Sequence, residues 1–366
     1  MKLKFSGKKI TGLALVVPEN ERKYVDDMAQ FNFSEAKSMR LMKVMGYDRH
    51  RIVEDGVCAS DLVEFGMRSL IRDGKLNADE IDALVYVTAT PDHFLPPTSR
   101  IIQGKLGLRQ DSLCFDLTQG CSGFEEGLIL AFMLLDQPEI RKVVVATGDT
   151  LSRKVSPRDR NSYPLIGDAA SIAIVENDPD GEPVYAVMRN DGSRCMALTI
   201  PAGCFRKPCS AETAEMREDA EGNFRSEDNL VMDGSGVFNF VMADVPPMLD
   251  ELCQFAGTSY ADYDWFLFHQ PNKFMLEKLA DKLGVSYDKM PSNVVEKYGN
   301  SSGTTVPAVI ALNLSDKLKT EKYKVLLSGF GVGLTWGAVS MNLGPLSFCE
   351  TVQYPNRRKQ DERVSP

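Results

Sequence analysis

The chain has 366 residues, of which 43% are hydrophobic and 25% charged, a globular composition with enough apolar material for a large core. Its formal net charge of −9 excludes a general nucleic-acid-binding surface, although a local basic patch stays open. No run of about 18 uncharged apolar residues occurs, so the sequence predicts no membrane span, and the N-terminus lacks the apolar stretch of a secretory signal.

Strand and helix patterns alternate along the chain, which predicts a layered α/β fold. The first half is expected to hold strands at 82–90, 112–117, 142–148 and 169–175, with helices at 99–108 and 120–135. The second half repeats this rhythm with strands at 184–190, 264–268, 324–327 and 335–343, and helices at 237–255, 272–283 and 304–318. Two prolines predict a kink or restart in the helix at 237–255. The polar stretch 193–231 is predicted to be an insertion loop.

The cysteines are informative through their spacing. There are eight of them, with no CxxC pair, in a chain without a signal pattern, so neither a disulfide framework nor a zinc site is indicated. We therefore expect reduced thiols, no metal and a cytoplasmic protein.

Cys121 stands out because a β-rich strand precedes it and a helical pattern follows it. We expect its thiol at a helix N-terminus, where the positive end of the helix dipole lowers a thiol pKa. Gly120 and Gly123 allow a sharp turn and a close backbone approach. The alternative is a small buried core cysteine, which is the interpretation for the other seven.

His269 and Asn300 are candidates in the second half. His269 ends an apolar strand just where a helix begins, and open α/β sheets place their chemistry at such strand ends. Asn300 lies in a turn-rich segment before a helix. Taken singly, His269 fits a hydrogen-bonded structural histidine and Asn300 fits a helix cap or turn residue. Their order after Cys121 favours a joint role.

Two glycine-rich segments match motifs of other enzyme classes and have to be compared with this interpretation. The run 329–337 is followed by a strand pattern, so a dinucleotide-binding turn is excluded, and backbone N–H groups around an anionic oxygen suit it better. Residues 299–303 match the hydrolase pattern G-x-S-x-G. No histidine follows that serine, however, so the hydrolase triad is excluded.

Together these segments resemble the 3-ketoacyl-ACP synthase III family of thiolase-like condensing enzymes. The matching segments are 118–124, 167–170, 268–272, 298–303 and 329–337. The resemblance implies an α/β fold of thiolase type, five-layered α/β/α/β/α, with two pseudo-symmetric βαβαβ halves. The halves are expected at 1–178, with the nucleophilic cysteine, and at 179–346, with the histidine and asparagine. A surface tail is expected at 347–366.

The resemblance also implies a ketoacyl synthase, an acyltransferase of fatty-acid or specialised acyl biosynthesis. Cys121 would take the acyl group from a thioester, and the backbone N–H groups of Cys121 and Val332 would form the oxyanion hole. His269 and Asn300 would bind the carbonyl of a malonyl thioester on an acyl carrier protein and stabilise the enolate left by decarboxylation. That enolate would attack the acyl-cysteine and give a 3-ketoacyl product. No metal or organic cofactor is implied.

Further family positions imply substrate and partner contacts. Substrate contacts are expected at Leu95, Arg160, Phe274 and Gly331. Relatives often carry an arginine at the position of Phe274, so a primer on an acyl carrier protein is expected, with acyl-CoA as the alternative. The carrier protein is expected to dock on Lys273, Lys278 and Lys282, with a solvated helix flank as the alternative. A homodimer is expected, in which Leu95 reaches across to the partner.

Two other classes stay open as alternatives. One is an acyl-transferring or thioester-hydrolysing relative of the same fold that does not decarboxylate, against which the presence of His269 and Asn300 argues. The other is a non-catalytic partner subunit, which would be expected to have lost the nucleophile Cys121. Acyl-chain length, the carrier of the primer and the pathway stay undetermined.

Overall fold

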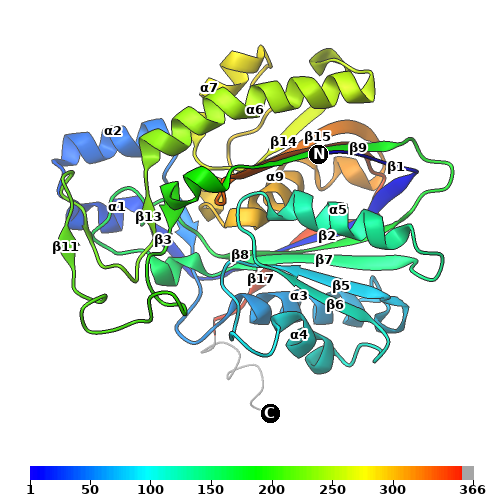
Figure 1. The fold of residues 1–366 in the computed structure, drawn as a ribbon, viewed down its shortest axis with the longest axis horizontal. Helices are drawn as coiled ribbons and strands as arrows, with labels where there is room; N and C mark the ends of the chain where they lie inside the picture. Colours follow the sequence, from blue (N-terminus) through cyan, green and yellow to red (C-terminus); the bar gives the residue numbers. More distant parts are fainter. Residues whose placement is uncertain (357–366) are drawn as a thin grey trace.

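Two mixed β-sheets face each other across a layer of helices, and further helices cover their outer faces (Figure 1). The computed structural model describes residues 1–356. The layers follow the order α/β/α/β/α, so the five-layered arrangement predicted from the sequence is confirmed.

The six-stranded sheet has the order β17-β2-β8-β7-β5-β6. In chain order its strands are β2 (Lys8–Pro18), β5 (Ala83–Val87), β6 (Leu113–Leu117), β7 (Lys142–Asp149), β8 (Ala169–Asn177) and β17 (Phe348–Tyr354). β5 pairs in parallel with β6 and β7, and β8 pairs antiparallel with β7 and β2. The central strands are apolar along their length because helices cover both faces.

The five-stranded sheet has the order β1-β9-β16-β15-β14. Its strands are β1 (Lys2–Phe5), β9 (Val184–Asn190), β14 (Trp265–Phe268), β15 (Tyr323–Gly331) and β16 (Thr335–Leu343). Only the pair β14–β15 is parallel; the other neighbours are antiparallel. The sequence predicted a catalytic residue at the carboxyl end of β14. This strand end lies beside β15.

The two sheets repeat one pairing pattern. The series β2-β8-β7-β5 and β9-β16-β15-β14 share the directions antiparallel, antiparallel, parallel. Each sheet also takes an edge strand from the other end of the chain, since β1 pairs with β9 and β17 pairs with β2. The expected division at 178 and 346 therefore does not separate the sheets, which are interlocked by these two strands.

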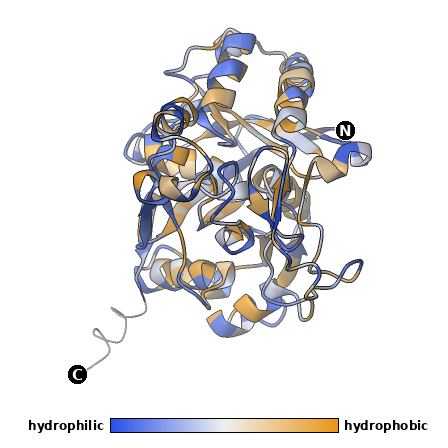
Figure 2. Cartoon of the chain, turned by 90° about the vertical axis from the view of Figure 1, so that its left-hand side faces the viewer, coloured by the Kyte–Doolittle hydropathy of each residue, from blue (hydrophilic) through white to orange (hydrophobic). Residues whose placement is uncertain are grey.

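The helices occupy three layers. Between the sheets lie α5 (Gly123–Leu135) and α9 (Thr305–Leu314), and nearly every residue of α9 is buried. The six-stranded sheet is covered by α3 (Ala59–Arg72) and α4 (Thr98–Leu106), and the five-stranded sheet by α6 (Gly234–Ala256) and α7 (Lys273–Leu283). Figure 2 shows hydrophilic and hydrophobic stretches together on the outer helices, as amphipathic covering helices require.

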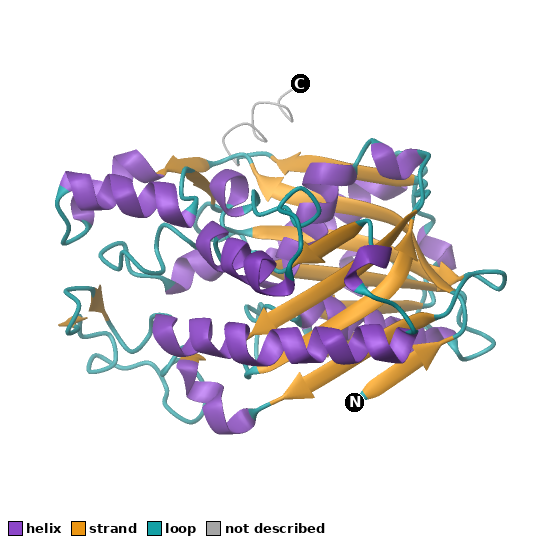
Figure 3. Ribbon diagram, turned by 90° about the horizontal axis from the view of Figure 1, so that it is seen from above, coloured by secondary structure: helices purple, strands orange, loops and turns teal. Residues whose placement is uncertain are grey.

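Short elements gather at one end of the molecule, on the left of Figures 1 and 3. They are β3 (Glu21–Lys23), α1 (Tyr24–Asp27), α2 (Glu35–Met45), β4 (Arg49–Arg51), β10 (Leu198–Thr199), β11 (Arg217–Glu218), β12 (Phe224–Arg225) and β13 (Val231–Met232). The pairs β10–β13 and β11–β12 are antiparallel and fall within or next to the insertion predicted at 193–231.

The remaining described elements are short helices. They are α8 (Val295–Tyr298) and the 3₁₀ helices Met28–Gln30, Ala78–Glu80, Leu151–Lys154, Gly192–Ala197, Tyr260–Asp262, Ser302–Thr304 and Lys317–Lys319. Over residues 1–356, no helix combines the length and apolarity needed to cross a membrane.

Three details differ from the sequence predictions. Residues 348–354 are not a surface tail but strand β17, whose first residues Phe348 and Cys349 are buried against the core; residues 357–366 lie outside the described residues. The helix does not restart at Pro246 and Pro247 but continues from residue 234 to residue 256. The helix after Cys121 begins only at Gly123, because residues 120–122 form a turn.

Candidate functional site

A cavity of about 710 Å³ opens at the end of the molecule where the short elements gather. Cys121, His269 and Asn300 all line it, although nearly 180 positions separate the first from the last. The three residues come from the turn before α5, the end of β14 and the loop before α9. The structure therefore brings together the three side chains that the sequence singled out.

Cys121 is held in a tight turn between β6 and α5. The N–H of Gly123 donates to the carbonyl of Gly120 at 2.7 Å, which turns the chain into the helix. Gly331, on the facing strand β15, passes so closely that a Cβ there would lie 2.6 Å from the Cys121 sulfur. Glycine at 331 is thus required for β15 to reach the nucleophile candidate.

The surroundings of Cys121 favour the neutral thiol. Burial raises the pKa of the thiol to about 11, while the backbone N–H groups of Val332 and Cys121 and the Ser302 hydroxyl oppose this rise by hydrogen bonding to the sulfur. The expected lowering of the thiol pKa by a helix N-terminus is therefore wrong here, since desolvation outweighs it. The two N–H groups that lower this pKa are the pair to which the family resemblance assigned the oxyanion hole.

His269 follows the last residue of β14, where its N–H donates to Ser328 O at 2.8 Å. Its Nδ1 lies 2.7 Å from the Thr305 hydroxyl oxygen, and that hydroxyl donates to Ser302 O at 2.9 Å. Because the single hydroxyl hydrogen goes to Ser302, Thr305 accepts the Nδ1–H of the ring. Burial lowers the pKa of His269 to about 3, so the ring is neutral and Nε2 carries a lone pair.

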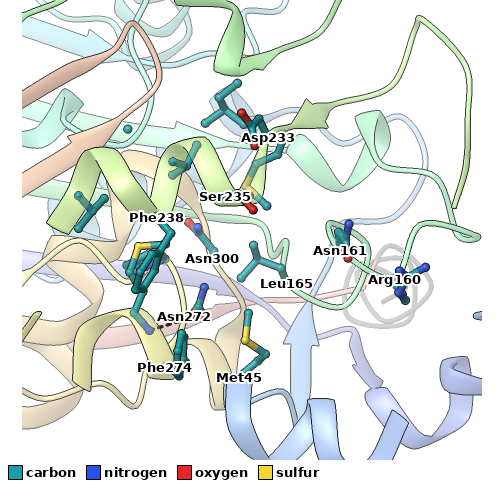
Figure 4. A pocket seen from close by; sticks show the side chains of 18 of the residues that line it. Met45, Arg160, Asn161, Leu165, Asp233, Ser235, Phe238, Asn272, Phe274 and Asn300 are labelled. Carbon is teal, nitrogen blue, oxygen red and sulfur yellow. Dashed lines mark hydrogen bonds between the residues drawn. The ribbon is translucent and has the colours of Figure 1, made fainter. Parts of the chain in front are cut away.

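Asn300 is fixed from both sides. Its N–H donates to Leu165 O at 2.7 Å, and its carbonyl accepts from Gly167 N at 3.1 Å, which joins the second half to the loop before β8. Its Oδ1 accepts the N–H of Ser302 at 2.9 Å, so the Nδ2 hydrogens remain to donate into the cavity. Figure 4 shows this side chain in the cavity near Leu165.

One side of the cavity is apolar and aromatic. Phe274 and Phe238 stack with ring centroids 5.8 Å apart and planes at 22° (Figure 4). Met45 and Leu165 continue this wall, and Gly331 completes it next to Cys121. The position of Phe274, expected to contact substrate, thus presents an aromatic surface and no cationic donor.

Arg160 also lines the cavity, but other residues already occupy its guanidinium. It donates to Glu221 O at 2.7 Å and to Asn223 Oδ1 at 2.9 Å, and it lies 4.3 Å from the centroid of the Phe33 ring. Residues of the insertion at 193–231 therefore hold Arg160 and form part of the cavity wall, which the sequence did not predict.

The remaining predicted contacts lie outside this cavity. Leu95 is 82% exposed on the loop before α4 and is not part of the cavity wall. Lys278 pairs with Asp281 at 3.2 Å, and Lys282 donates to Met242 O at 2.7 Å. Lys273 lines a second, more open groove of about 490 Å³ together with Arg40 and Lys43 of α2.

Three buried residues next to the candidate site were missed by sequence reasoning. Thr305 contacts His269, Ser302 contacts Asn300, and Asp149 lies at the carboxyl end of β7. Of these three residues, only Asp149 could have been found from the sequence. It is a polar residue at the end of an apolar strand, and open α/β folds place catalytic residues at such strand ends.

Comparison with family models and curated proteins gives one consistent answer. Residues 115–192 match the model "3-Oxoacyl-[acyl-carrier-protein (ACP)] synthase III", and residues 253–343 match the model of its C-terminal part. A "putative 3-oxoacyl-[acyl-carrier-protein] synthase 3" of Campylobacter jejuni is 31% identical over 94% of this chain and 97% of its own length. A "beta-ketoacyl-[acyl-carrier-protein] synthase III" of Streptococcus suis is 33% identical over 87% of this chain and 94% of its own.

Among solved structures, a 3-oxoacyl-(acyl-carrier protein) synthase from Burkholderia xenovorans superposes with a TM-score of 0.89. It is 32% identical, and the match covers 97% of this chain and 99% of that one. The expected five-layered fold of the thiolase-like condensing enzymes is therefore shared over nearly the whole chain.

Proposed function

This chain belongs to the 3-oxoacyl-[acyl-carrier-protein] synthase III family, and we propose that its condensing reaction runs through an acyl group on Cys121. It is a β-ketoacyl-ACP synthase III, an acyltransferase of fatty-acid biosynthesis. The observation that carries the assignment of residues is the convergence of Cys121, His269 and Asn300 on one cavity.

In the loading step, the Cys121 sulfur attacks the carbonyl carbon of an acyl thioester. A bond forms between that carbon and Cys121, the bond to the leaving sulfur breaks, and the leaving sulfur takes up the proton that the thiol gives up. We propose that the N–H groups of Cys121 and Val332 stabilise the oxyanion of the tetrahedral intermediate.

In the condensation step, the carbonyl oxygen of a malonyl thioester binds between Asn300 Nδ2 and His269 Nε2. Asn300 is ready to donate, but the neutral His269 ring carries its hydrogen on Nδ1. The negative charge of the malonyl group favours the charged ring, which then donates from Nε2 to the developing enolate. Loss of CO₂ gives the enolate, which attacks the acyl-cysteine, and one proton is consumed overall as the thiol is restored.

The walls of the cavity favour a primer carried by an acyl carrier protein. Phe274 offers an aromatic surface, and the guanidinium of Arg160 is held by Glu221 and Asn223, so neither supplies a free cation for a nucleotide phosphate. We propose that the acidic carrier docks over the groove formed by Arg40, Lys43 and Lys273, which shares Tyr47 with the cavity. Lys278 and Lys282, which do not line this groove, would contribute less.

The edge strand β6 supports the proposal of a homodimer. Leu113 and Phe115 are 42% and 37% exposed on this unpaired edge. The loop with Phe94 and Leu95, also exposed, is tied to the same strand, because Asp116 accepts the N–H of Thr98 at 2.6 Å. An apolar, unprotected sheet edge is unfavourable in a monomer. A cytoplasmic location stays a prediction.

Intact mass spectrometry after incubation with a panel of acyl thioesters tests this assignment. An acyl mass should appear on the wild-type chain and be absent from Cys121→Ala, with Cys253→Ala as a control that removes another buried cysteine. Release of CO₂ from malonyl-ACP by the acylated protein separates a condensing enzyme from a relative that only transfers or hydrolyses acyl groups. An adduct that persists on Cys121→Ala would contradict the assignment.

A further inference from the structure

Asp168 is a fully buried residue that does not belong to the cavity wall, and neither step of the proposed reaction uses it. It lies directly before β8, in the segment 167–170 that matches the family pattern. A carboxyl group taken out of water is costly unless other groups bind it. The partners of Asp168 therefore indicate what it does.

Three donors bind the carboxyl group of Asp168. Its Oδ2 accepts the N–H of Val53 at 2.9 Å and the hydroxyl of Ser152 at 2.5 Å, and its Oδ1 accepts the N–H of Ser152 at 3.1 Å. The N–H of Asp168 donates to Arg51 O at 2.7 Å. These bonds tie the start of β8 to the end of β4 and to the 3₁₀ helix Leu151–Lys154. Because all partners of the carboxyl group are donors, the arrangement suits its ionised form.

The residues just before Asp168 hold the backbone of Asn300. The N–H of Gly167 donates to Asn300 O at 3.1 Å, and Leu165 O accepts the N–H of Asn300 at 2.7 Å. Between these two bonds, Ile166 and Asn300 pair as in a parallel sheet. The segment 165–168 thus fixes the backbone of a candidate catalytic residue from the other half of the chain.

The segment 165–168 and the chain before Asn300 approach each other backbone to backbone. A Cβ at Gly167 would lie 2.0 Å from Tyr298 O, and a Cβ at Gly299 would lie 2.8 Å from Gly167 Cα. Gly299 also has a φ of 79°, which favours glycine. With no side chain between the two backbones, a displacement of Gly167 is passed directly to Asn300.

We propose that Asp168 is a positioning residue for the condensation step, because its ionised carboxyl group holds the segment 165–168 that aligns Asn300. A hydrogen bond from Asn300 Nδ2 to the malonyl carbonyl oxygen needs a narrow range of distance and angle. Loading on Cys121 does not use Asn300, so it should not depend on Asp168. The effect on condensation rests on the proposed function, whereas the hold on the Asn300 backbone does not.

The charge of Asp168 changes within an accessible pH range. Burial raises the pKa of Asp168 to about 6, while the hydrogen bonds from Ser152 and Val53 and the charge of Arg153 oppose this rise. Protonation places a hydrogen on an oxygen that faces donors and weakens these bonds. The hold on Asn300 is therefore present above about pH 6 and lost as the pH falls through this value.

Other titratable groups lie on the strands next to Asp168. On β4, burial lowers the pKa of His50 to about 4, and the side chain of Arg51 pairs with Glu21 at 3.0 Å. At the end of β7, beside the first residue of β8, burial raises the pKa of Asp149 to about 7. A test therefore has to shift the titration of Asp168 and leave these groups in place.

Single-turnover release of CO₂ from malonyl-ACP between pH 5 and 8.5 measures the condensation step, and intact mass measures loading. In the wild type, CO₂ release should bend near pH 6 and fall below it. Ser152→Ala removes a donor to the carboxylate and raises the pKa of Asp168, so this bend should move to higher pH. Asp168→Asn cannot ionise and should lose this bend. Its CO₂ release at pH 7.5 should be about 10- to 100-fold slower, the scale of buried donors left unpaired, and its loading should change far less.

Asp82→Asn is the matched control. Asp82 is a buried carboxyl group directly before β5 that accepts the N–H groups of Arg141 at 2.7 Å and Lys142 at 3.0 Å. It lies at the opposite end of the six-stranded sheet, because β8 runs antiparallel to β7 and β5 runs parallel to it. This variant should release CO₂ like the wild type.

Hydrogen exchange of the whole protein, read by mass spectrometry, tests the hold on Asn300 without substrate. Peptides that contain Asn300 should exchange faster in Asp168→Asn than in the wild type or Asp82→Asn, because the bond from Asn300 N–H to Leu165 O is weakened. Unchanged exchange around Asn300 would overturn the proposal, as would a bend near pH 6 that persists in Asp168→Asn. A wild type that releases no CO₂ would refute the proposed function instead, and the exchange experiment would still decide the role of Asp168.

Discussion

The Nδ1 atom of His269 lies 2.7 Å from the hydroxyl oxygen of Thr305, and the other bonds of Thr305 decide which ring nitrogen carries the hydrogen. The hydroxyl donates to Ser302 O at 2.9 Å, and its oxygen also accepts the N–H of Gln270 at 3.2 Å. The ring is therefore held with Nε2 free toward the substrate. Thr305 thus fixes Nε2 of the neutral ring as a lone pair, and Nε2 can donate to the enolate only when the ring is charged.

Thr305→Val keeps the shape of this side chain and removes its hydroxyl. The loss of a buried hydrogen-bonding centre costs about 1–3 kcal/mol where partners stay unpaired, so decarboxylation of malonyl-ACP should fall about 10- to 100-fold. Release of CO₂ under single-turnover conditions measures it. Thr305→Ser retains the hydroxyl and should stay close to the wild type; a loss in Thr305→Ser together with wild-type activity in Thr305→Val would mean that the γ-methyl packing, not the hydrogen bond, matters.

His269→Ala and Asn300→Ala should affect the extender step more than loading. In the proposed mechanism both side chains bind the malonyl carbonyl oxygen, whereas loading uses the Cys121 sulfur and two backbone N–H groups. Decarboxylation should drop about 100-fold or more, the scale of a lost oxyanion or acid–base contact. Acylation of Cys121, followed by intact mass, should change much less. Wild-type decarboxylation in both variants would refute these roles.

The identity and order of the three candidate residues could be predicted from the sequence because each lies at a strand end or turn that the hydrophobic pattern marks. Cys121 follows a β-rich run, His269 ends an apolar run, and Asn300 precedes a helix. The layered fold could be predicted for the same reason, since alternating strands and helices leave few arrangements.

Other features depend on contacts between distant parts of the chain, which a sequence pattern does not encode. The thiol pKa of Cys121 is raised by burial, to which Gly331, more than 200 positions away, contributes by its close approach; a helix N-terminus alone predicted the opposite. The strained φ of Ser302 is imposed by its partners and not by its own residue type. Strand β17 reads as a polar tail because only its first residues face the core.

The groove lined by Arg40, Lys43 and Lys273 should control docking of the acidic carrier protein. Charge reversal by Lys43→Glu together with Lys273→Glu should raise the KM for malonyl-ACP several-fold and weaken the salt dependence of turnover, because like charges now oppose the carrier. Steady-state kinetics at two ionic strengths measures both effects. Lys278→Glu is the matched control, since Lys278 lies on the same helix as Lys273 but does not line the groove. Unchanged kinetics in the double variant would make these lysines an ordinary solvated helix flank.

The exposed edge β6 should form the contact between two copies of the chain. Phe115→Lys places a charge on this edge, where it would be desolvated in a dimer and solvated in a monomer. Light scattering at micromolar concentration should show a dimer for the wild type and a shift toward monomer for the variant. Val25→Lys, on α1 and 47% exposed, is the control and should stay dimeric. A wild-type monomer would contradict this assembly.

Leu95 should set the accepted acyl length through that dimer. Within one chain it lies outside the cavity and is 82% exposed, so any effect on the acyl pocket must reach a second copy. Pro96 and Pro97 restrict the backbone of its loop, which limits the positions that the side chain can take. Leu95→Trp should shorten the acyl chain that loads on Cys121, and Leu95→Ala should lengthen or broaden the range, as read by intact mass across a panel of acyl thioesters.

The Trp variant combined with Phe115→Lys should lose this shift in chain length as the dimer dissociates. If the length profile changes equally without the dimer, or not at all in either single variant, Leu95 is an ordinary exposed loop residue.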